Sequence, residues 1–210
     1  MFRLRARFNR SEPVKYISHL DIIRLWQRAF RRAGLELAYS EGFNPHPRLS
    51  LAAPLPLGVT SEAELMDVFT VKSVSPQSLM SMVNCQLPPG IEITQACHVP
   101  LELPSLQSQV RLADYLVTVK GDAGEVSQAI ESLLRKETLP WQHQRDTGTR
   151  NYDLRALIDD MWLGGWRDGG GEIGMRLVCS GSGSGRPEQV VKALGLDEPV
   201  AVHRTRLVLG

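Results

Sequence analysis

The start of the chain shows its clearest alternation of apolar and polar residues. Apolar side chains occupy positions 2, 4, 6 and 8, and arginines occupy positions 3, 5 and 7. A period of two is typical of a half-buried strand, because successive side chains point to opposite faces. The pattern therefore predicts a strand over residues 2–8 whose outer face is covered by arginine.

In residues 18–33 the apolar positions recur with the period of a helix. The expected apolar stripe comprises Ile23, Trp26, Phe30 and Ala33, with Leu20 and Ile22 near it. The basic residues lie off this stripe, at Arg24, Arg28, Arg31 and Arg32. Ser18 and, three residues later, Asp21 resemble a capping box, and Gly34 is a natural stop. The segment predicts an amphipathic helix with a basic outer side.

Further strands and a second helix are predicted after this first strand and helix. Extended candidates at 35–39 and 48–53 flank a loop whose prolines exclude a helix. A strand (62–71), a helix (76–85) and a strand (90–98) follow, which completes a ferredoxin-like βαββαβ order. Residues 100–109 look like a connector. We therefore expect a first domain at 1–99, with the basic face.

The same order is predicted again after the connector. The candidates are a strand (111–120), a helix (123–136), extended segments (139–144 and 151–163), a strand (172–179), a helix (186–194) and a strand (200–209). Segment 151–163 reads either as strand throughout or as strand ending in helix. The sequence thus predicts an α+β protein of two tandem ferredoxin-like halves, the second at 110–210.

Composition narrows the class of protein. The chain has 210 residues, of which 42% are hydrophobic and 22% charged, as in globular proteins. No apolar run approaches the roughly 20 residues of a membrane span, and the first residues lack the pattern of a signal peptide. We expect a cytoplasmic protein. Its cysteines (Cys85, Cys97, Cys179) lack metal-site spacing and are interpreted as buried thiols, so no metal or cofactor is expected.

Positive charge is concentrated near the start of the chain. Residues 1–60 contain ten Lys/Arg and only four Asp/Glu, although the net charge of the chain is +1. Arginine binds phosphate in a bidentate manner and stacks on bases. We therefore expect Arg5, Arg7, Arg24, Arg28, Arg31 and Arg48 to contact RNA phosphates, against the alternative of a solvated charged face.

Two histidines lie in this basic region. His19 and His46 are candidates for acid–base catalysis, and with Asp21 and Glu41 they form a conceivable metal set that no tight spacing supports. The alternative is that Ser18 and Asp21 simply cap the helix while His19 is solvated.

The loop around His46 reads SEGFNPHPR and is stiffened by two prolines. We expect its Phe43, Asn44 and His46 to contact a base or sugar, because they offer stacking and hydrogen bonds. The alternative is a structural loop whose polar groups bond to its own backbone.

A Gly/Ser loop at 180–185 precedes Arg186 and Pro187. Exposed backbone N–H groups beside Arg186 would form a second anion site. The alternative is a flexible connector, and the loop lacks the ending of a nucleotide-binding motif.

The block KYISHLDIIRLWQRAFRRAGLELAYSEGFNPHPRLSLAAPLPLG, from Lys15 to Gly58, resembles the signature of the DUF2344 family. Looser matches follow in YDLRALI, GRPEQVVKALG and HRTRL. Members of this family are known as radical SAM-linked or radical SAM-associated proteins. The resemblance implies a radical SAM partner, fused or encoded nearby, and a genomic setting with ribonuclease E/G and ribosomal protein genes. It supplies no assigned catalytic residues.

This chain lacks the CxxxCxxC cluster motif, so the resemblance implies the accessory form with its radical SAM partner on a separate chain. The leading hypothesis is an RNA-binding accessory protein. One alternative is a metal-independent RNA endonuclease, since the order of elements is similar to that of repeat-associated RNA-processing enzymes. A second alternative is a docking module for the radical SAM partner.

Overall fold

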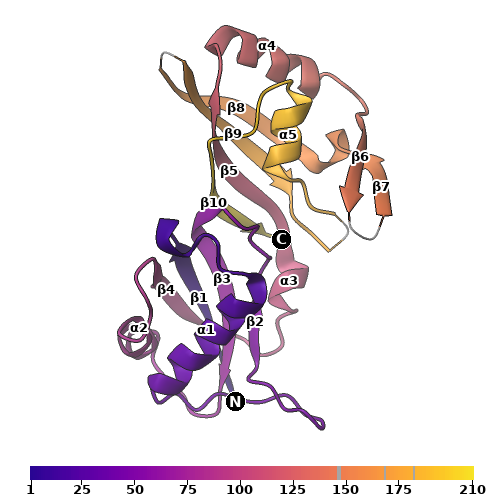
Figure 1. Cartoon of the computed structure of the whole chain (residues 1–210). Helices are drawn as coiled ribbons and strands as arrows, with labels where there is room; N and C mark the ends of the chain where they lie inside the picture. The colour runs from indigo at the N-terminus through magenta and orange to yellow at the C-terminus, as the bar shows by residue number, and fades with distance from the viewer. Residues whose placement is uncertain (146–147, 168, 182) are drawn as a thin grey trace. The chain divides into compact units, whose positions relative to one another are not determined.

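The structure is a computed structural model that describes residues 1–145, 148–167, 169–181 and 183–210, with only the backbone of residues 144 and 145. The chain divides into two compact units, Met1–Val110 with Gly210, and Arg111–Leu209 (Figure 1). Each unit combines antiparallel strands with helices in ferredoxin-like order. The predicted α+β class with ferredoxin-like topology is confirmed.

The first unit contains β1 (Phe2–Arg10), the 3-10 turn η1 (Glu12–Val14), α1 (His19–Arg32), β2 (Leu49–Leu51), β3 (Thr60–Thr70), α2 (Pro76–Asn84), β4 (Ile91–Val99) and α3 (Leu106–Gln109). Strand β1 pairs antiparallel with β3 and β4, and β2 pairs with β3. The resulting order, β4-β1-β3-β2, is that of a ferredoxin-like sheet. It places β1 and β3 side by side in the centre.

One face of this sheet packs against α1 and α2. Leu4, Ala6 and Phe8 of β1 are buried there, as the alternation predicts. Trp26 of α1 packs edge-on against Phe8 at a centroid distance of 4.9 Å and stacks on Phe30 at 5.6 Å. The core therefore depends on large aromatic side chains from the helix whose other side is basic.

The apolar stripe of α1 shares Trp26 and Phe30 with the predicted stripe and differs from it in its other two residues. The buried residues are Ile22, Trp26, Ala29 and Phe30, whereas Ile23 is half-buried and Leu20 is 65% exposed. The observed spacing follows the helical repeat of i, i+4, i+7 and i+8. Packing on the sheet thus selects one of two nearly equivalent stripes.

The opposite face of the sheet is also covered in part. Arg3 points outward as predicted, yet it is only 4% exposed. Its Nη1 donates to the carbonyl oxygen of Leu103 at 2.6 Å, and its Nη2 to that of Pro104 at 2.9 Å. The connector, which ends in the short helix α3, therefore lies over the outer side of β1.

The second unit contains β5 (Val110–Lys120), α4 (Ala123–Leu134), β6 (Pro140–Arg145), β7 (Gly148–Asp153), η2 (Arg155–Leu157), β8 (Ile158–Arg167), β9 (Gly170–Val178), α5 (Pro187–Ala193) and β10 (Ala201–Leu209). The order β10-β5-β9-β8 repeats that of the first unit. Strands β6 and β7 form a separate hairpin inserted after α4. Segment 151–163 is strand, then a three-residue 3-10 turn, then strand again.

A pair of aromatic–glycine contacts shapes the second sheet. Trp162 of β8 lies over Gly174 of β9, where an added Cβ would overlap the indole ring. Trp166 lies over Gly171 in the same way, and a Cβ at that glycine would also collide with the ring. Glycine is needed at these positions because the strand must admit a flat ring.

Two other expectations concern cysteine and the membrane. Cys85 and Cys97 are exposed and Cys179 is buried, so the interpretation of three buried thiols is wrong for two of them. Both exposed thiols lie at solvent-facing positions, one just after α2 and one on β4. Among the described residues, no helix is both long and apolar enough to cross a bilayer.

Candidate functional site

Ser18 caps the N-terminus of α1. Ser18 Oγ accepts the backbone N–H of Asp21 at 3.2 Å and donates to the Asp21 carboxylate at 2.7 Å. The hydrogen bond from Ser18, followed by that from Arg24, lowers the pKa of Asp21. The carboxylate is thereby held charged at the positive end of the helix dipole. Ser18 and Asp21 thus have a structural role.

His19 is the first residue of α1 and is half-buried. Among the described residues, no group of three or more His, Cys, Asp or Glu side chains is arranged to hold a metal ion. The cap at Ser18 and Asp21 forms without the imidazole of His19. The role of His19 as an acid or base stays a prediction.

A groove runs along the basic side of α1, which we call the α1 groove. It has a volume of about 500 Å³ and is lined by Arg24, Arg28 and Arg31 on one side and by Tyr39 and Pro47 on the other. The rise of 1.5 Å per residue places Arg24 and Arg28 about 6 Å apart along the axis, and Arg31 about 4.5 Å further. The three arginines therefore lie on one face of the helix and line the same groove.

The charge of this groove is only partly compensated. Arg24 donates to Asp21 at 3.1 Å, and both side chains are more than half exposed. Arg28 and Arg31 are exposed, and neither has a carboxylate within ion-pair distance in the described parts of the chain. Tyr39 is 58% exposed beside them. The groove combines a positive row with an exposed aromatic ring.

The loop after α1 forms a projecting arm, residues 39–48. Tyr39 and Pro47 pair as an isolated bridge, and the N–H of Ser40 donates to the carbonyl oxygen of His46 at 2.8 Å. The N–H of His46 donates in return to Ser40 Oγ at 3.0 Å. These bonds fix the base of the arm, so the loop is ordered by its own backbone as well as by its prolines.

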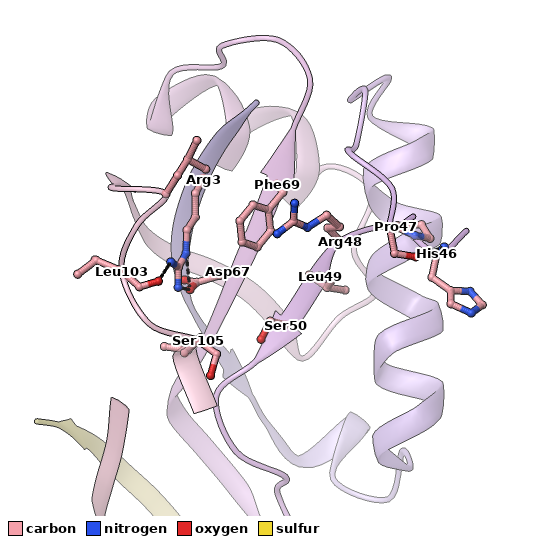
Figure 2. A pocket seen from close by; sticks show the side chains of 13 residues that line it. Arg3, His46, Pro47, Arg48, Leu49, Ser50, Asp67, Phe69, Leu103 and Ser105 are labelled. Carbon is pink, nitrogen blue, oxygen red and sulfur yellow. Dashed lines mark hydrogen bonds and ion pairs between the residues drawn. The ribbon is translucent and has the colours of Figure 1, made fainter. Parts of the chain in front are cut away.

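The tip of the arm consists of exposed residues. Phe43 is fully exposed, and Asn44 and His46 are also exposed. Gly42 has φ = +118°, a conformation that favours glycine. Figure 2 shows the imidazole of His46 directed away from the pocket beside it. The three predicted base-contacting residues thus share one solvent-facing arm next to the α1 groove.

Behind the base of the arm lies a second cavity of about 500 Å³, which we call the Asp67 pocket. The carboxylate of Asp67 is fully buried and receives Nε and Nη2 of Arg3 at 3.0 and 2.6 Å (Figure 2). Arg5 donates to the same carboxylate through Nε at 2.8 Å and Nη2 at 3.1 Å. Two arginines therefore share one acid inside the sheet face.

Phe69 lies between two guanidinium groups in this pocket. The Cζ of Arg48 is 4.4 Å from its ring centroid, and that of Arg3 is 5.5 Å away. Arg48 is exposed, and Pro47 lines both this pocket and the α1 groove. The two cavities are thus neighbours, separated by the base of the arm.

The other predicted phosphate ligands are placed differently. Arg5 has its donors engaged by Asp67 and by Gln109 Oε1 at 3.2 Å. Arg7 is half-buried and donates to the carbonyl oxygen of Glu62 at 3.1 Å. The sequence pattern does not reveal Asp67 as the partner of Arg5, because this acid lies 62 residues away on β3. Arg5 therefore contributes less free charge than expected, whereas Arg7 keeps its charge because its partner is a neutral carbonyl.

Arg186 is exposed and precedes α5, a helix of only seven residues. Gly185 of the preceding loop is buried, and a Cβ there would approach the carbonyl oxygen of Leu157 to 2.9 Å. Part of the loop is thus packed. Ser182 lies outside the described residues, and the predicted anion site at this loop stays a prediction.

Comparisons with known proteins identify a family and a fold. The sequence profile of the family described as "Uncharacterized protein conserved in bacteria (DUF2344)" matches residues 3–187. No curated protein matches the chain significantly. Among solved structures, a chain of a Cbf5–Nop10–Gar1 complex is similar with a TM-score of 0.55 and 9% identity, covering 98% of this chain and 49% of that chain.

A chain of the archaeal box H/ACA sRNP Nop10–Cbf5 complex is similar with a TM-score of 0.50 and 9% identity, covering 98% of this chain and 48% of that chain. This protein thus spans about half the length of each similar chain. At such low identity the likeness concerns the fold alone.

Proposed function

The chain belongs to the DUF2344 family, and we propose that it is an RNA-binding accessory protein that presents RNA to a radical SAM enzyme on a separate chain. The α1 groove is the observation that carries the RNA-binding part. The family resemblance supports the radical SAM partner. One structure of similar fold belongs to an archaeal box H/ACA sRNP complex, and an RNA partner is in keeping with that likeness.

The α1 groove suits a nucleic acid strand for three reasons. Its arginines lie on one helix face, about 6 Å and then about 4.5 Å apart along the axis, so that they can meet more than one phosphate of a strand. Arg28 and Arg31 form no ion pair within the described residues, although Arg28 is close enough to Asp21 to help lower its pKa, so a phosphate bound to these two arginines breaks no ion pair. Tyr39 and Phe43 add exposed rings on which bases stack.

The charge around the groove favours RNA over a neutral partner. Phosphate groups release counterions when arginine binds them, so affinity depends steeply on salt. A stiff arm also loses less conformational entropy on binding than a flexible loop. We infer that phosphates lie on Arg24, Arg28 and Arg31, with Arg48 beyond them, while Phe43, Asn44 and His46 contact bases or sugars.

The test is the salt dependence of RNA affinity in the Arg24→Ala plus Arg28→Ala variant. Each lost phosphate contact should reduce the slope of log K against log salt by about 0.7 for a single strand, or about 1.4 for both. A matched control removes two exposed charges from the second unit, Arg135→Ala plus Lys192→Ala. An unchanged slope in the first variant would refute the groove as the RNA site.

A docking role for the same surface is the second candidate, because the fully exposed Phe43 equally suits a protein contact. Co-purification with the radical SAM partner distinguishes the two roles. If the complex survives nuclease treatment, fails on Phe43→Ser, and RNA affinity is unchanged by that substitution, the arm binds protein instead.

A further inference from the structure

The Asp67 pocket holds features that RNA phosphate binding does not explain. It is a cavity of about 500 Å³, within the size range of small-molecule sites. Its lining mixes apolar side chains, such as Phe69, Leu49 and Leu103, with Arg48 and Ser50. A flat apolar wall with a few polar groups is typical of a site for an aromatic ligand.

The walls of this pocket are fixed by buried ion pairs. Asp67 is 0% exposed and Arg3 is 4% exposed, and the two are joined by two hydrogen bonds. Arg3 also holds the connector through the carbonyl oxygens of Leu103 and Pro104. The pocket is thus pre-formed on both sides, by the sheet and by the connector, as Figure 2 shows.

Arg48 lies at the mouth of this pocket and has hydrogen-bond donors available for a ligand. One side of its guanidinium lies over Phe69 at 4.4 Å, and its one identified hydrogen bond joins Nη1 to the Sδ of Met1 at 3.2 Å. Thioether sulfur is a weak acceptor. No carboxylate within the described residues pairs with Arg48. A planar cation is therefore held by an aromatic ring, with its other side accessible.

The charge inside the pocket excludes a cationic ligand. Arg3 and Arg48 line the pocket together with a single acid, Asp67, and this acid is already saturated by four N–H donors of Arg3 and Arg5. The pocket therefore offers net positive charge, the planar guanidinium of Arg48 that Phe69 supports, and hydroxyl groups. A nucleobase carrying a nearby phosphate satisfies all three, since guanidinium groups stack on bases and bind phosphate through their edges.

We propose that the Asp67 pocket receives one unstacked base of the RNA strand that lies in the α1 groove. Pro47 lines both cavities, so they adjoin, and a strand that follows the arginine row can continue into the pocket. The base stacks on Arg48, which is itself supported by Phe69, and Ser50 lies within the pocket. The inference rests on the proposed function because the strand enters from the α1 groove.

The experiment uses a single-stranded RNA of about ten nucleotides with 2-aminopurine placed at each position in turn. Binding of the full chain should change the fluorescence strongly at one position, where the base leaves its neighbours. Arg48→Lys keeps the charge but not the planar group, so this change should be lost and affinity should fall roughly tenfold. Arg135→Lys, at an exposed pair in the second unit, is the control.

A second variant fills the pocket without altering its charge. Ser50→Trp should remove the fluorescence change while the salt slope of RNA binding stays as in the wild type. Since Ser50 is half-buried, Arg48→Lys at an exposed position keeps the test valid if Ser50→Trp fails to fold. Normal RNA binding with no position-specific change, or with a change that both variants retain, would overturn the pocket and leave the proposed function intact.

Binding of free mononucleotides is measured separately in the same experiment. If AMP, CMP, GMP or UMP binds and Arg48→Lys abolishes that binding, while the RNA gives no position-specific change, the ligand is a free nucleotide and the strand-borne base is refuted. If the chain binds no RNA at any salt concentration, the proposed function itself fails. The two failures are therefore distinguishable.

Discussion

Removal of the Asp67 carboxylate is the substitution with the largest expected effect on folding. In Asp67→Ala, the guanidinium groups of Arg3 and Arg5 lose their shared acid. The Arg3 side chain is 3% exposed and that of Asp67 is 1% exposed, so water cannot replace the lost contact for Arg3. Arg5 is 12% exposed and regains some hydration.

The magnitude follows from the burial of the pair. Breaking a buried ion pair by removing one partner costs roughly 3–5 kcal/mol, because a charge is left unpaired in a low-dielectric environment. We expect about 4 kcal/mol for Asp67→Ala, which corresponds to about a thousandfold in the ratio of folded to unfolded protein. Arg3 also anchors the connector, so its disorder adds to this loss rather than offsetting it.

Urea unfolding measures this loss, with hydrogen exchange of β1 and β3 to identify the first unit. The matched control is Glu36→Ala, which removes an acid from the exposed pair with Lys72, where the side chains are 54% and 74% exposed. An exposed pair contributes only about 0–1 kcal/mol. If Asp67→Ala destabilises the first unit no more than Glu36→Ala does, the argument from buried charge is wrong.

Two further predictions concern pH and packing. The pKa of Asp21 is lowered in the folded chain, so its stabilising effect is present above the unfolded pKa of about 4 and is lost as pH falls through the folded value. Asp21→Asn should therefore reduce the melting temperature at pH 7, and this deficit should disappear at an acidic pH below the folded pKa. A deficit that persists at the acidic pH would contradict this. Gly174→Ala should cost about 1–3 kcal/mol, because its Cβ would overlap the Trp162 ring, and calorimetry should show recovery in the double variant with Trp162→Ala. Gly165→Ala is the control, since nothing lies within 4 Å of that Cβ, and equal losses for both glycines would contradict the packing argument.

Local sequence patterns predicted the features of the fold that depend only on residues close together in the chain. The capping role of Ser18 and Asp21 needs only the first turn of α1, and the alternation from Phe2 to Phe8 needs only the pleat of a strand. The order of elements in both units follows from such patterns. The fold class could therefore be predicted from the sequence. The strands β6 and β7 lie in segments predicted as extended, but their pairing as a separate hairpin outside the ferredoxin-like order was not predicted.

Long-range contacts account for what could not be predicted. The outer face of β1 is arginine-rich as expected, but only the folded chain shows that the connector covers Arg3 and that Asp67 holds Arg3 and Arg5. Such pairing between residues far apart in the sequence leaves no periodic signal. The row of Arg24, Arg28 and Arg31 was predictable, whereas its neighbour Tyr39 and the adjoining Asp67 pocket were not.

The central claim is that RNA lies in the α1 groove and along the arm. Ultraviolet crosslinking of the full chain to bound RNA, followed by mass spectrometry of the linked peptides, tests it most directly. The account predicts nucleotides linked to the peptides that contain Tyr39 and Phe43, and loss of these links in the Arg24→Ala plus Arg28→Ala variant. Crosslinks confined to residues 111–209, or none at these two aromatic residues, would contradict it.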